Sequence, residues 1–308
     1  MTQFNISRRS ALAGAASLPF IASAASNAQA AAPMMGESIP NFMRVKVGDF
    51  EVTNLMVGSR VVEGPQNIFG MNASAEDFAT ASAAAGIPTD KVRFYFTPTV
   101  VNTGSELVLF DTGLNGAATV GVLEAAGYTA DQIDIVVITH MHGDHVGGLS
   151  GDTGVTFPNA RYVTGRVEFD AWAAQDNDTF KAKVAPLAEQ FTFLEDGGSA
   201  ASGITAMAAF GHTPGHMAYM IDSAGKQLAI CADFANHYVW SLAYPDWEVR
   251  FDMDKAAAAA TRKRMLDMMA TDKIAFTGYH MPFPAFGYVD KPAAGGYAWV
   301  AHSYQMTL

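Results

Sequence analysis

The stretch Ile133-Asp134-Ile135-Val136-Val137-Ile138-Thr139-His140-Met141-His142-Gly143-Asp144-His145 begins with a predicted buried strand. Four side chains that can bind metal come immediately after this strand: His140, His142, Asp144 and His145. The first six residues form a short, β-branched, largely apolar run of the kind found in core strands. His140 and His142 are two residues apart, so both imidazoles leave an extended chain on the same side. Gly143 allows the chain to turn, which sends Asp144 and His145 elsewhere. One loop can therefore serve two neighbouring metals, and imidazole and carboxylate ligands favour zinc.

The H-x-H-x-D-H pattern of this loop resembles the signature of the metallo-β-lactamase superfamily. Three further segments match the superfamily's remaining ligand positions in the expected order: Gly211-His212-Thr213-Pro214-Gly215-His216, Asp233 after Leu228–Ala232, and His280 in Thr277-Gly278-Tyr279-His280. The resemblance implies two divalent metal ions, most simply zinc. It assigns one metal to His140, His142 and His216, and the other to Asp144, His145 and His280. It places Asp233 between the two metals as a bridge.

Within the superfamily, the chain is most similar in its motifs to the methyl parathion hydrolase type. The matching stretches are Val101–Ser105, Leu109–Gly113, Ala126–Tyr128, Phe157–Ala160, Gly211–His216 and Phe283–Pro284. The resemblance implies that Asp111 lies behind the metals and orients a ligand imidazole through its free N–H. His212 is a second candidate for such a supporting position. Candidates for the substrate pocket are Phe94, Phe96, Trp172, His237, Tyr238 and Phe283.

The implied activity is a dinuclear hydrolase in which a hydroxide bridging the metals attacks an ester, a lactone or a phosphotriester with an apolar leaving group. Asp144 and Asp233 are the expected catalytic carboxylates, and Asp144 is also a candidate for proton transfer to the leaving group. One departure concerns lactonases of the superfamily, which carry a tyrosine three residues after the bridging aspartate. Asn236 stands there in this chain, followed by His237 and Tyr238.

Two alternative functions stay open on the sequence alone. A periplasmic metallo-β-lactamase would use a similar histidine set, and turnover of nitrocefin would distinguish it. An iron-dependent dioxygenase can have the same fold, and metal analysis would separate it from a zinc hydrolase. One scaffold hosts many chemistries, so the resemblance carries the fold and the metal site further than the substrate.

The first thirty residues predict an export signal, and 31–308 a single catalytic domain. The segment carries Arg8 and Arg9 without an acidic residue, continues as an Ala-rich apolar run and ends in the cleavage pattern Ala28-Gln29-Ala30. Ser7-Arg8-Arg9-Ser10-Ala11-Leu12 resembles a twin-arginine signal, with an ordinary secretory signal as the alternative. The expected location is the periplasm.

The composition and charge of this domain limit the kinds of partner that it can bind. The chain has 308 residues and a net charge of −11, with no lysine or arginine cluster, which argues against nucleic acid or an anionic membrane as partner. The expected partner is a small neutral organic molecule, and a homodimer is left open. The single cysteine, Cys231, cannot form an internal disulfide, and its apolar strand predicts a buried, inert thiol.

The pattern of predicted strands and helices divides the domain into two halves, each a set of strands followed by helices. Two hairpins are expected, one over 42–56 and one that pairs 92–101 with 106–110. Further strands are expected over 133–138, 160–164, 204–210, 217–222, 228–232 and 297–304. Helices are expected over 74–85, 117–126, 167–174, 180–189 and 254–269. This order predicts an α+β protein, a four-layer αβ/βα sandwich. The segment 58–65 reads as a loop, the region 58–88 as a cover over the site or a surface excursion, and Arg262-Lys263-Arg264 as a solvated helix face.

Overall fold

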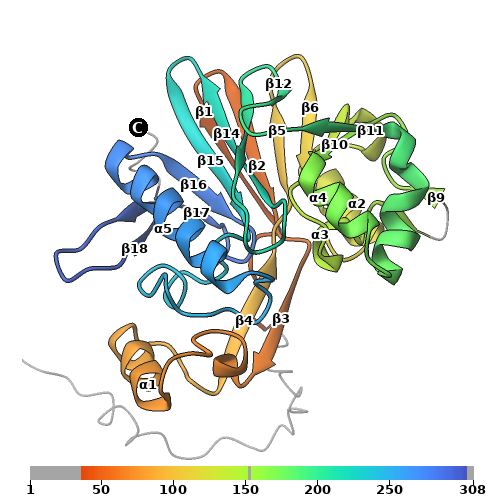
Figure 1. Ribbon diagram of the computed structural model, residues 1–308. Coiled ribbons are helices and arrows are strands. Elements are labelled where there is room, and N and C mark those ends of the chain that lie inside the picture. Colours follow the sequence, from red (N-terminus) through yellow and green to blue (C-terminus); the bar gives the residue numbers. More distant parts are fainter. Residues whose placement is uncertain (1–35, 152–153, 304–308) are drawn as a thin grey trace, which may run out of the picture. The chain divides into compact units, whose positions relative to one another are not determined.

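Two seven-stranded sheets form the centre of the structure, a computed structural model that describes residues 36–151 and 154–303 (Figure 1). The predicted export segment 1–30 lies outside the described residues. Pro40–Leu308 form one unit, separate from the residues before it, and the fold described below is that of this unit. None of the described helices combines the length and the apolar character that crossing a membrane requires.

The first sheet contains the strand that leads into the metal-binding loop. Its strands, in spatial order, are β1 (Phe42–Val47), β2 (Phe50–Leu55), β5 (Thr99–Asn102), β6 (Leu107–Phe110), β7 (Ile135–Ile138), β10 (Arg161–Gly165) and β11 (Phe191–Leu194). The last four are parallel to one another. In β7, Ile135 and Val137 face the second sheet, whereas Val136 and Ile138 face the helices. Burial on both faces explains why this strand is apolar without alternation.

The second sheet packs face to face against the first. Its strands, in order, are β12 (Ser199–Ala201), β13 (Ile204–Ala208), β14 (Met217–Ser223), β15 (Lys226–Ala232), β16 (Ala275–Gly278), β17 (Phe286–Asp290) and β18 (Ala298–Ala301). The core between the sheets joins residues of both, as in the edge-to-face pair of Phe110 and Tyr219, whose ring centroids are 5.1 Å apart. Cys231 of β15 is a buried free thiol, as predicted.

Helices cover the outer face of each sheet (Figure 1). The outer face of the first sheet packs against α2 (Gly116–Ala125), α3 (Gly143–Val146) and α4 (Arg166–Ala173), and that of the second against α5 (Lys255–Asp272). Asp254 caps α5 by accepting from the backbone N–H of Ala257. The order helix, sheet, sheet, helix confirms the predicted αβ/βα sandwich.

A ribbon outside the two sheets differs from the predicted elements. Strands β3 (Gly58–Glu63) and β4 (Lys91–Phe96) pair with each other, with the short helices η1 (Pro65–Asn67) and α1 (Ala75–Ala84) between them. The prediction of a loop over 58–65 is therefore wrong. The prediction of a single strand over 92–101 is also wrong, because β4 ends at Phe96 and pairs with β3, whereas β5 begins at Thr99 and belongs to the first sheet. Pro98, between the two strands, has no N–H to donate.

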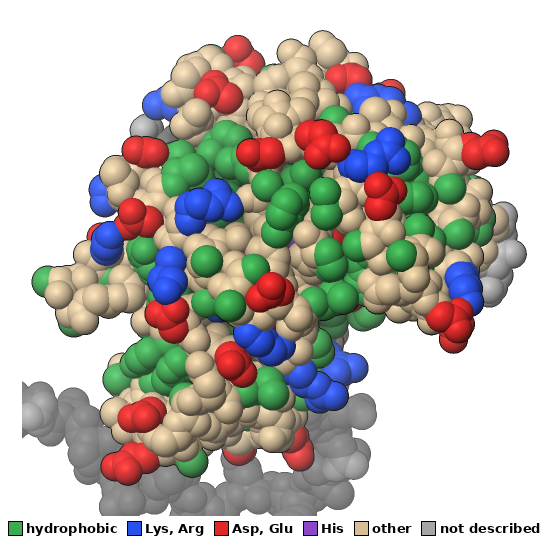
Figure 2. Space-filling view, in the orientation of Figure 1, with side chains coloured by type: hydrophobic (Ala, Val, Ile, Leu, Met, Phe, Trp, Pro, Cys, Tyr) green, Lys and Arg blue, Asp and Glu red, His purple; other side chains and the backbone are tan. Residues whose placement is uncertain are grey.

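Two smaller expectations also need correction. The segment 180–189 is a short π-helix (η3, Phe180–Val184) followed by a 3₁₀ helix (η4, Ala185–Gln190), and Pro186 removes a donor where the α-helix would continue. Arg262 is buried in α5 rather than solvated. The remaining short elements are η2 (Ala130–Gln132), β8 (Ser150–Gly151) and β9 (Gly154–Val155). Acidic, basic and apolar side chains are interspersed on the face drawn in Figure 2.

Candidate metal centre

Loops that follow strands of both sheets meet at one edge of the sandwich. The loop after β7 carries His140 and His142 and continues into α3, whose first turn holds Asp144 and His145. The other contributors lie after β13, β15 and β16. Seven side chains form three overlapping groups, and within each group the candidate ligand atoms lie within 4.8 Å of one another. The first group is His140, His142 and His212, the second is Asp144, His145 and His280, and a third, His140, His145 and Asp233, links these two.

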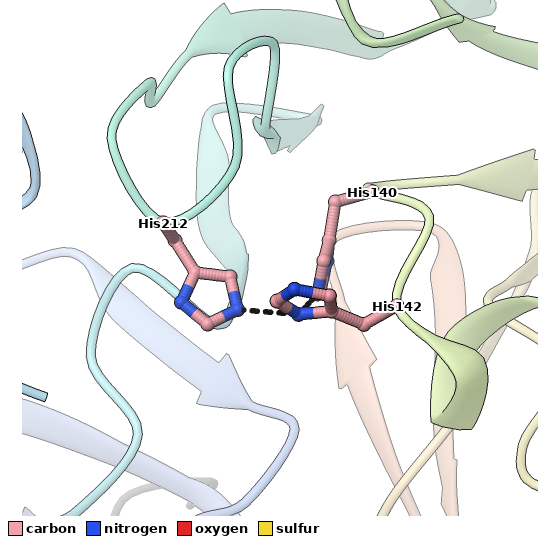
Figure 3. Close-up of side chains that lie close together, drawn as sticks. All are labelled: His140, His142 and His212. Carbon is pink, nitrogen blue, oxygen red and sulfur yellow. Dashed lines mark hydrogen bonds between the residues drawn. The ribbon is translucent and has the colours of Figure 1, made fainter. Parts of the chain in front are cut away.

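The first group consists of three imidazoles whose ring nitrogens face one another (Figure 3). Nδ1 of His142 lies 3.1 Å from Nε2 of His140 and 3.0 Å from Nε2 of His212. Burial lowers the pKa of His142 to about 3, with the neighbouring His212 as the next cause, and burial also lowers that of His140. Neutral imidazoles with converging lone pairs are the form that binds a cation.

The placement of His212 corrects the sequence prediction. His216 was expected in this group and His212 behind it, and the structure exchanges the two. Nε2 of His216 accepts from the backbone N–H of Asp233 at 3.1 Å, and His216 belongs to none of the groups above. His216 therefore lies behind the bridging candidate, and His212 takes the third position.

The second group joins Asp144, His145 and His280. Nε2 of His280 lies 3.4 Å from Oδ2 of Asp144, and Nε2 of His145 lies 3.7 Å from the same oxygen. Burial opposes the charged forms, but carboxylates around each ring outweigh it. Asp233 and Asp144 raise the pKa of His280 to about 10, and Asp111 is the main cause that raises that of His145.

Asp233 lies between the two groups. Its Oδ2 is 3.4 Å from Nε2 of His212 in the first group, and 3.1 Å and 3.5 Å from Nε2 of His280 and His145 in the second. Its Oδ1 and Nε2 of His145 are buried without a hydrogen-bond partner among the described residues. Since buried polar atoms are normally satisfied, these free atoms and the converging nitrogens fit two divalent cations sharing Asp233.

His145 and His212 are each oriented by a buried carboxylate that contacts the ring nitrogen Nδ1. Asp111 accepts from Nδ1 of His145 at 2.8 Å, and it also accepts from the backbone N–H and hydroxyl of Thr139. This is the contact that its predicted supporting role requires. Asp252, which the sequence did not single out, lies 2.8 Å from Nδ1 of His212. Such bonds fix the ring so that Nε2 points at the metal.

Glu168 of α4 is a second residue that sequence reasoning missed. It is fully buried, and its two oxygens accept from the backbone of Met141 and the indole of Trp172, and from the hydroxyl of Thr213 and the backbone of Gly215. Met141 lies between His140 and His142, and Thr213 follows His212. One carboxylate thus connects the two loops that carry the first group.

A cavity of about 300 Å³ opens above the seven residues. His142, Asp144, Asp233 and His280 lie at its base. Its remaining lining is mostly apolar and comprises Arg60, Val62, Ile68, Phe94, Phe96, Leu114, Gly143 and Phe251. Phe94 and Phe96 therefore lie where the sequence predicted pocket residues, and the β3–β4 ribbon that carries Phe94 covers part of the site. Leu114 and Phe251 are exposed at about half their surface, and no sequence pattern marked them.

The other pocket candidates are not among the residues that line this cavity. Trp172 is buried behind His142, with its ring edge-on at a centroid distance of 5.8 Å. His237 and Tyr238 line a neighbouring cavity with Tyr95 and Trp240. Phe283 lies outside the lining as well. The placement of these four in a substrate pocket stays a prediction.

The fold and the donor set define a metallo-β-lactamase-type protein. Residues 97–274 match the family described as the metallo-beta-lactamase superfamily, and the chain belongs to this superfamily. An N-acyl homoserine lactonase of Bacillus sp is 26% identical over 165 residues, which are 52% of this chain and 61% of that protein. Protein YobT of Bacillus subtilis strain 168, described as uncharacterized, is 29% identical over 42% of this chain and 58% of its own length. The chain thus spans about 60% of the curated relatives it matches.

Solved structures are similar over nearly their whole length. AidC, a dizinc quorum-quenching lactonase in complex with a product, has a TM-score of 0.77 and 25% identity, covering 86% of this chain and 98% of its own. The hydrolase AbOPH of the beta lactamase superfamily has a TM-score of 0.80 and 22% identity, covering 87% and 99%. The latter similarity shows the fold alone. The closer kinship with the methyl parathion hydrolase type stays a prediction.

Proposed function

We propose that this protein is a dinuclear, metal-dependent hydrolase of lactones and related carboxylic esters. The observation that carries the proposal is the set of seven converging side chains at the base of an apolar-walled cavity. The relatives named as lactonases, including the dizinc enzyme AidC, support the same reaction class and zinc as the metal.

The residues divide the work by position. His140, His142 and His212 would hold one ion, Asp144, His145 and His280 the other, and Asp233 both. Two such ions supply an acidified water and an electrophile for the carbonyl oxygen. Asp144, whose side chain is 22% exposed whereas that of Asp233 is 4% exposed, is the better placed carboxylate to pass a proton to the leaving group. The apolar walls exclude water and favour a neutral substrate with an apolar acyl or alcohol part.

The lactonase tyrosine position needs a separate explanation. Asn236 stands there, and its amide donates to Oδ2 of Asp233 at 3.1 Å, so it orients the shared carboxylate rather than the substrate. No tyrosine occurs among the described residues that line the cavity. We therefore expect this protein to open lactones without the help of a tyrosine hydroxyl, and more slowly than lactonases that carry the tyrosine.

A substrate panel on zinc-loaded protein tests the proposal. The panel comprises N-acyl homoserine lactones, a δ-lactone, an aryl ester, a phosphotriester and nitrocefin, each with and without chelator. We expect the lactones or the aryl ester to be the best substrates and chelation to abolish turnover. Nitrocefin as the best substrate would instead identify a β-lactamase, and iron with oxygen uptake a dioxygenase.

A pair of histidine substitutions provides the matched control. His280→Ala removes a second-group residue and should lower turnover by at least 100-fold, with about one zinc ion retained per chain. His302→Ala alters a histidine that follows β18 and lines a different cavity, together with Lys46 and Lys226, and should change neither quantity. Full activity with two zinc ions in His280→Ala would refute the ligand assignment.

A further inference from the structure

We propose that Asp252 and Arg262 are positioning residues that fix the proton of His212 on Nδ1 and thereby set the affinity of the first metal position. The proposal rests on the metal centre of the proposed function. It concerns side chains behind that centre, which are not among the residues that line the cavity above the metal centre. All three side chains are about 1% exposed.

The three side chains form a continuous buried chain of hydrogen bonds. Oδ1 of Asp252 lies 2.8 Å from Nδ1 of His212, and Oδ2 of Asp252 accepts from Nη2 of Arg262 at 2.7 Å. Arginine stays protonated and has no acceptor, whereas an ionised carboxylate only accepts. The hydrogen of His212 therefore belongs on Nδ1. Its Nε2 is left with a lone pair that points toward His142 and Asp233.

Arg262 also holds the backbone behind the bridging carboxylate. Its Nε donates to the carbonyl of Phe234, the residue after Asp233, at 3.0 Å, and its Nη1 donates to that of Pro245 at 2.7 Å. A lysine could replace the charge but not this planar fork of donors. Helix α5 thus orients one histidine and one carboxylate of the centre through a single side chain.

The loop of His212 is fastened to the same helix by its backbone. The carbonyl of His212 accepts from the N–H of Met253 at 3.0 Å, and that of Gly211 accepts from Asp254 at 2.9 Å. The hydroxyl of Thr261 donates to the carbonyl of Phe210 at 2.7 Å. Because these contacts hold the loop without Asp252, a change of Asp252 alone can alter the ring of His212 while the loop stays in place.

Asp252→Asn is the sharpest test, because it keeps the size of the side chain. The amide oxygen can satisfy Arg262, and the amide nitrogen then faces Nδ1 of His212 and donates to it. This reverses the tautomer and places a hydrogen on Nε2, where the metal would bind. Loss of a supporting partner of a ligand typically costs 10- to 100-fold in metal affinity.

The experiment is zinc titration of the full chain in competition with a chromophoric chelator. We expect Asp252→Asn to bind one zinc ion at least 10-fold more weakly than wild type and the other within about twofold. Arg262→Lys should weaken zinc binding in the same sense. Arg264→Lys, two positions along α5 on an exposed side chain, is the control and should match wild type.

Two further readouts separate positioning from a general loss of structure. Chelator-treated Asp252→Asn should keep a cooperative thermal transition, and ¹⁵N chemical shifts of His212 in metal-free protein should report hydrogen on Nε2 instead of Nδ1. Unchanged affinity at both positions in folded Asp252→Asn would overturn the proposal, as would an equal loss at both. Wild-type protein that binds no zinc would instead overturn the metal centre itself.

Discussion

Replacement of Glu168 should separate the two loops that carry the first metal group. Four donors point at this buried carboxylate, from Met141 and Trp172 to Oε1 and from Thr213 and Gly215 to Oε2, at 2.7–2.9 Å. Burial raises the pKa of Glu168 in spite of these bonds, so the ionised form carries a desolvation cost. Glutamate suits this position in spite of that cost, because both of its side-chain oxygens accept hydrogen bonds.

The expected loss of unfolding free energy follows from the number of hydrogen-bond donors that each substitution leaves without an acceptor. Glu168→Gln replaces one oxygen by an amide that cannot accept, so two donors lose their partner, at about 1–3 kcal/mol each. Relief of the buried charge offsets part of this, and we expect a loss of about 2–4 kcal/mol. Glu168→Ala orphans all four donors and opens a cavity, so a loss above about 4 kcal/mol is expected.

Urea unfolding in the presence of a chelator measures these losses without any contribution from metal binding. Zinc titration of the same variants should show weakened binding at one position, because His140 and His142 lie on one loop and His212 on the other. Glu189→Gln, an exposed glutamate of η4, is the matched control and should stay within about 0.5 kcal/mol of wild type. Metal-free Glu168→Gln and Glu168→Ala that are both as stable as wild type would refute the reasoning.

Three further outcomes are expected. Burial lowers the pKa of His237 from 6.5 to about 3, so stability is present above pH 6.5 and declines as the pH falls towards 3; the loss between pH 7 and pH 5 should be about 2 kcal/mol smaller in His237→Gln, as urea unfolding would show. Gly211 has a φ of +123°, and a β-carbon would lie 2.1 Å from a backbone nitrogen of α5, so Gly211→Ala should lose at least about 2 kcal/mol, whereas Gly121→Ala on the open face of α2 should be neutral or stabilising; equal stability of the two variants would contradict this. Replacing Arg8 and Arg9 by lysine should stop export by the twin-arginine route in a fractionation assay, and export that continues would contradict that prediction, which rests on sequence alone.

The parts of the fold that the sequence predicted are those whose burial is simple. β7 is apolar throughout because it is covered on both faces, and this makes it recognisable without tertiary information. The β3–β4 ribbon is different, since residues of β3 are largely exposed and β4 is its one strand partner in the part of the chain that the structure describes. A strand that depends on one distant partner leaves no clear periodicity, so the sequence pattern predicts a loop over 58–65 instead of β3.

The candidate site shows the same limit at the level of single residues. The metal-binding side chains of the loop from His140 to His145 could be predicted to lie together, because they are closely spaced in the sequence. His212 and His216 lie in one short motif, and only tertiary packing decides between them. A β-carbon on Gly215 would lie 2.1 Å from the backbone nitrogen of Glu168, so this end of the motif is pressed against α4. Arg262 gave no signal at all, because a basic run on a helix usually faces solvent.

Each half of the sandwich orients one histidine of the metal centre through a buried carboxylate. In the first half Asp111 holds His145, and Thr139 at the end of β7 fixes Asp111. In the second half Asp252 holds His212, and Arg262 of α5 fixes Asp252. His145 and His212 are therefore each oriented by a carboxylate of their own half, and Asp233 and Glu168 connect the two halves at the metal centre. Substitutions among these buried carboxylates should consequently act on metal affinity before substrate preference. Changes at wall residues such as Phe94 and Leu114, which supply no supporting carboxylate, should act on substrate preference with metal binding intact.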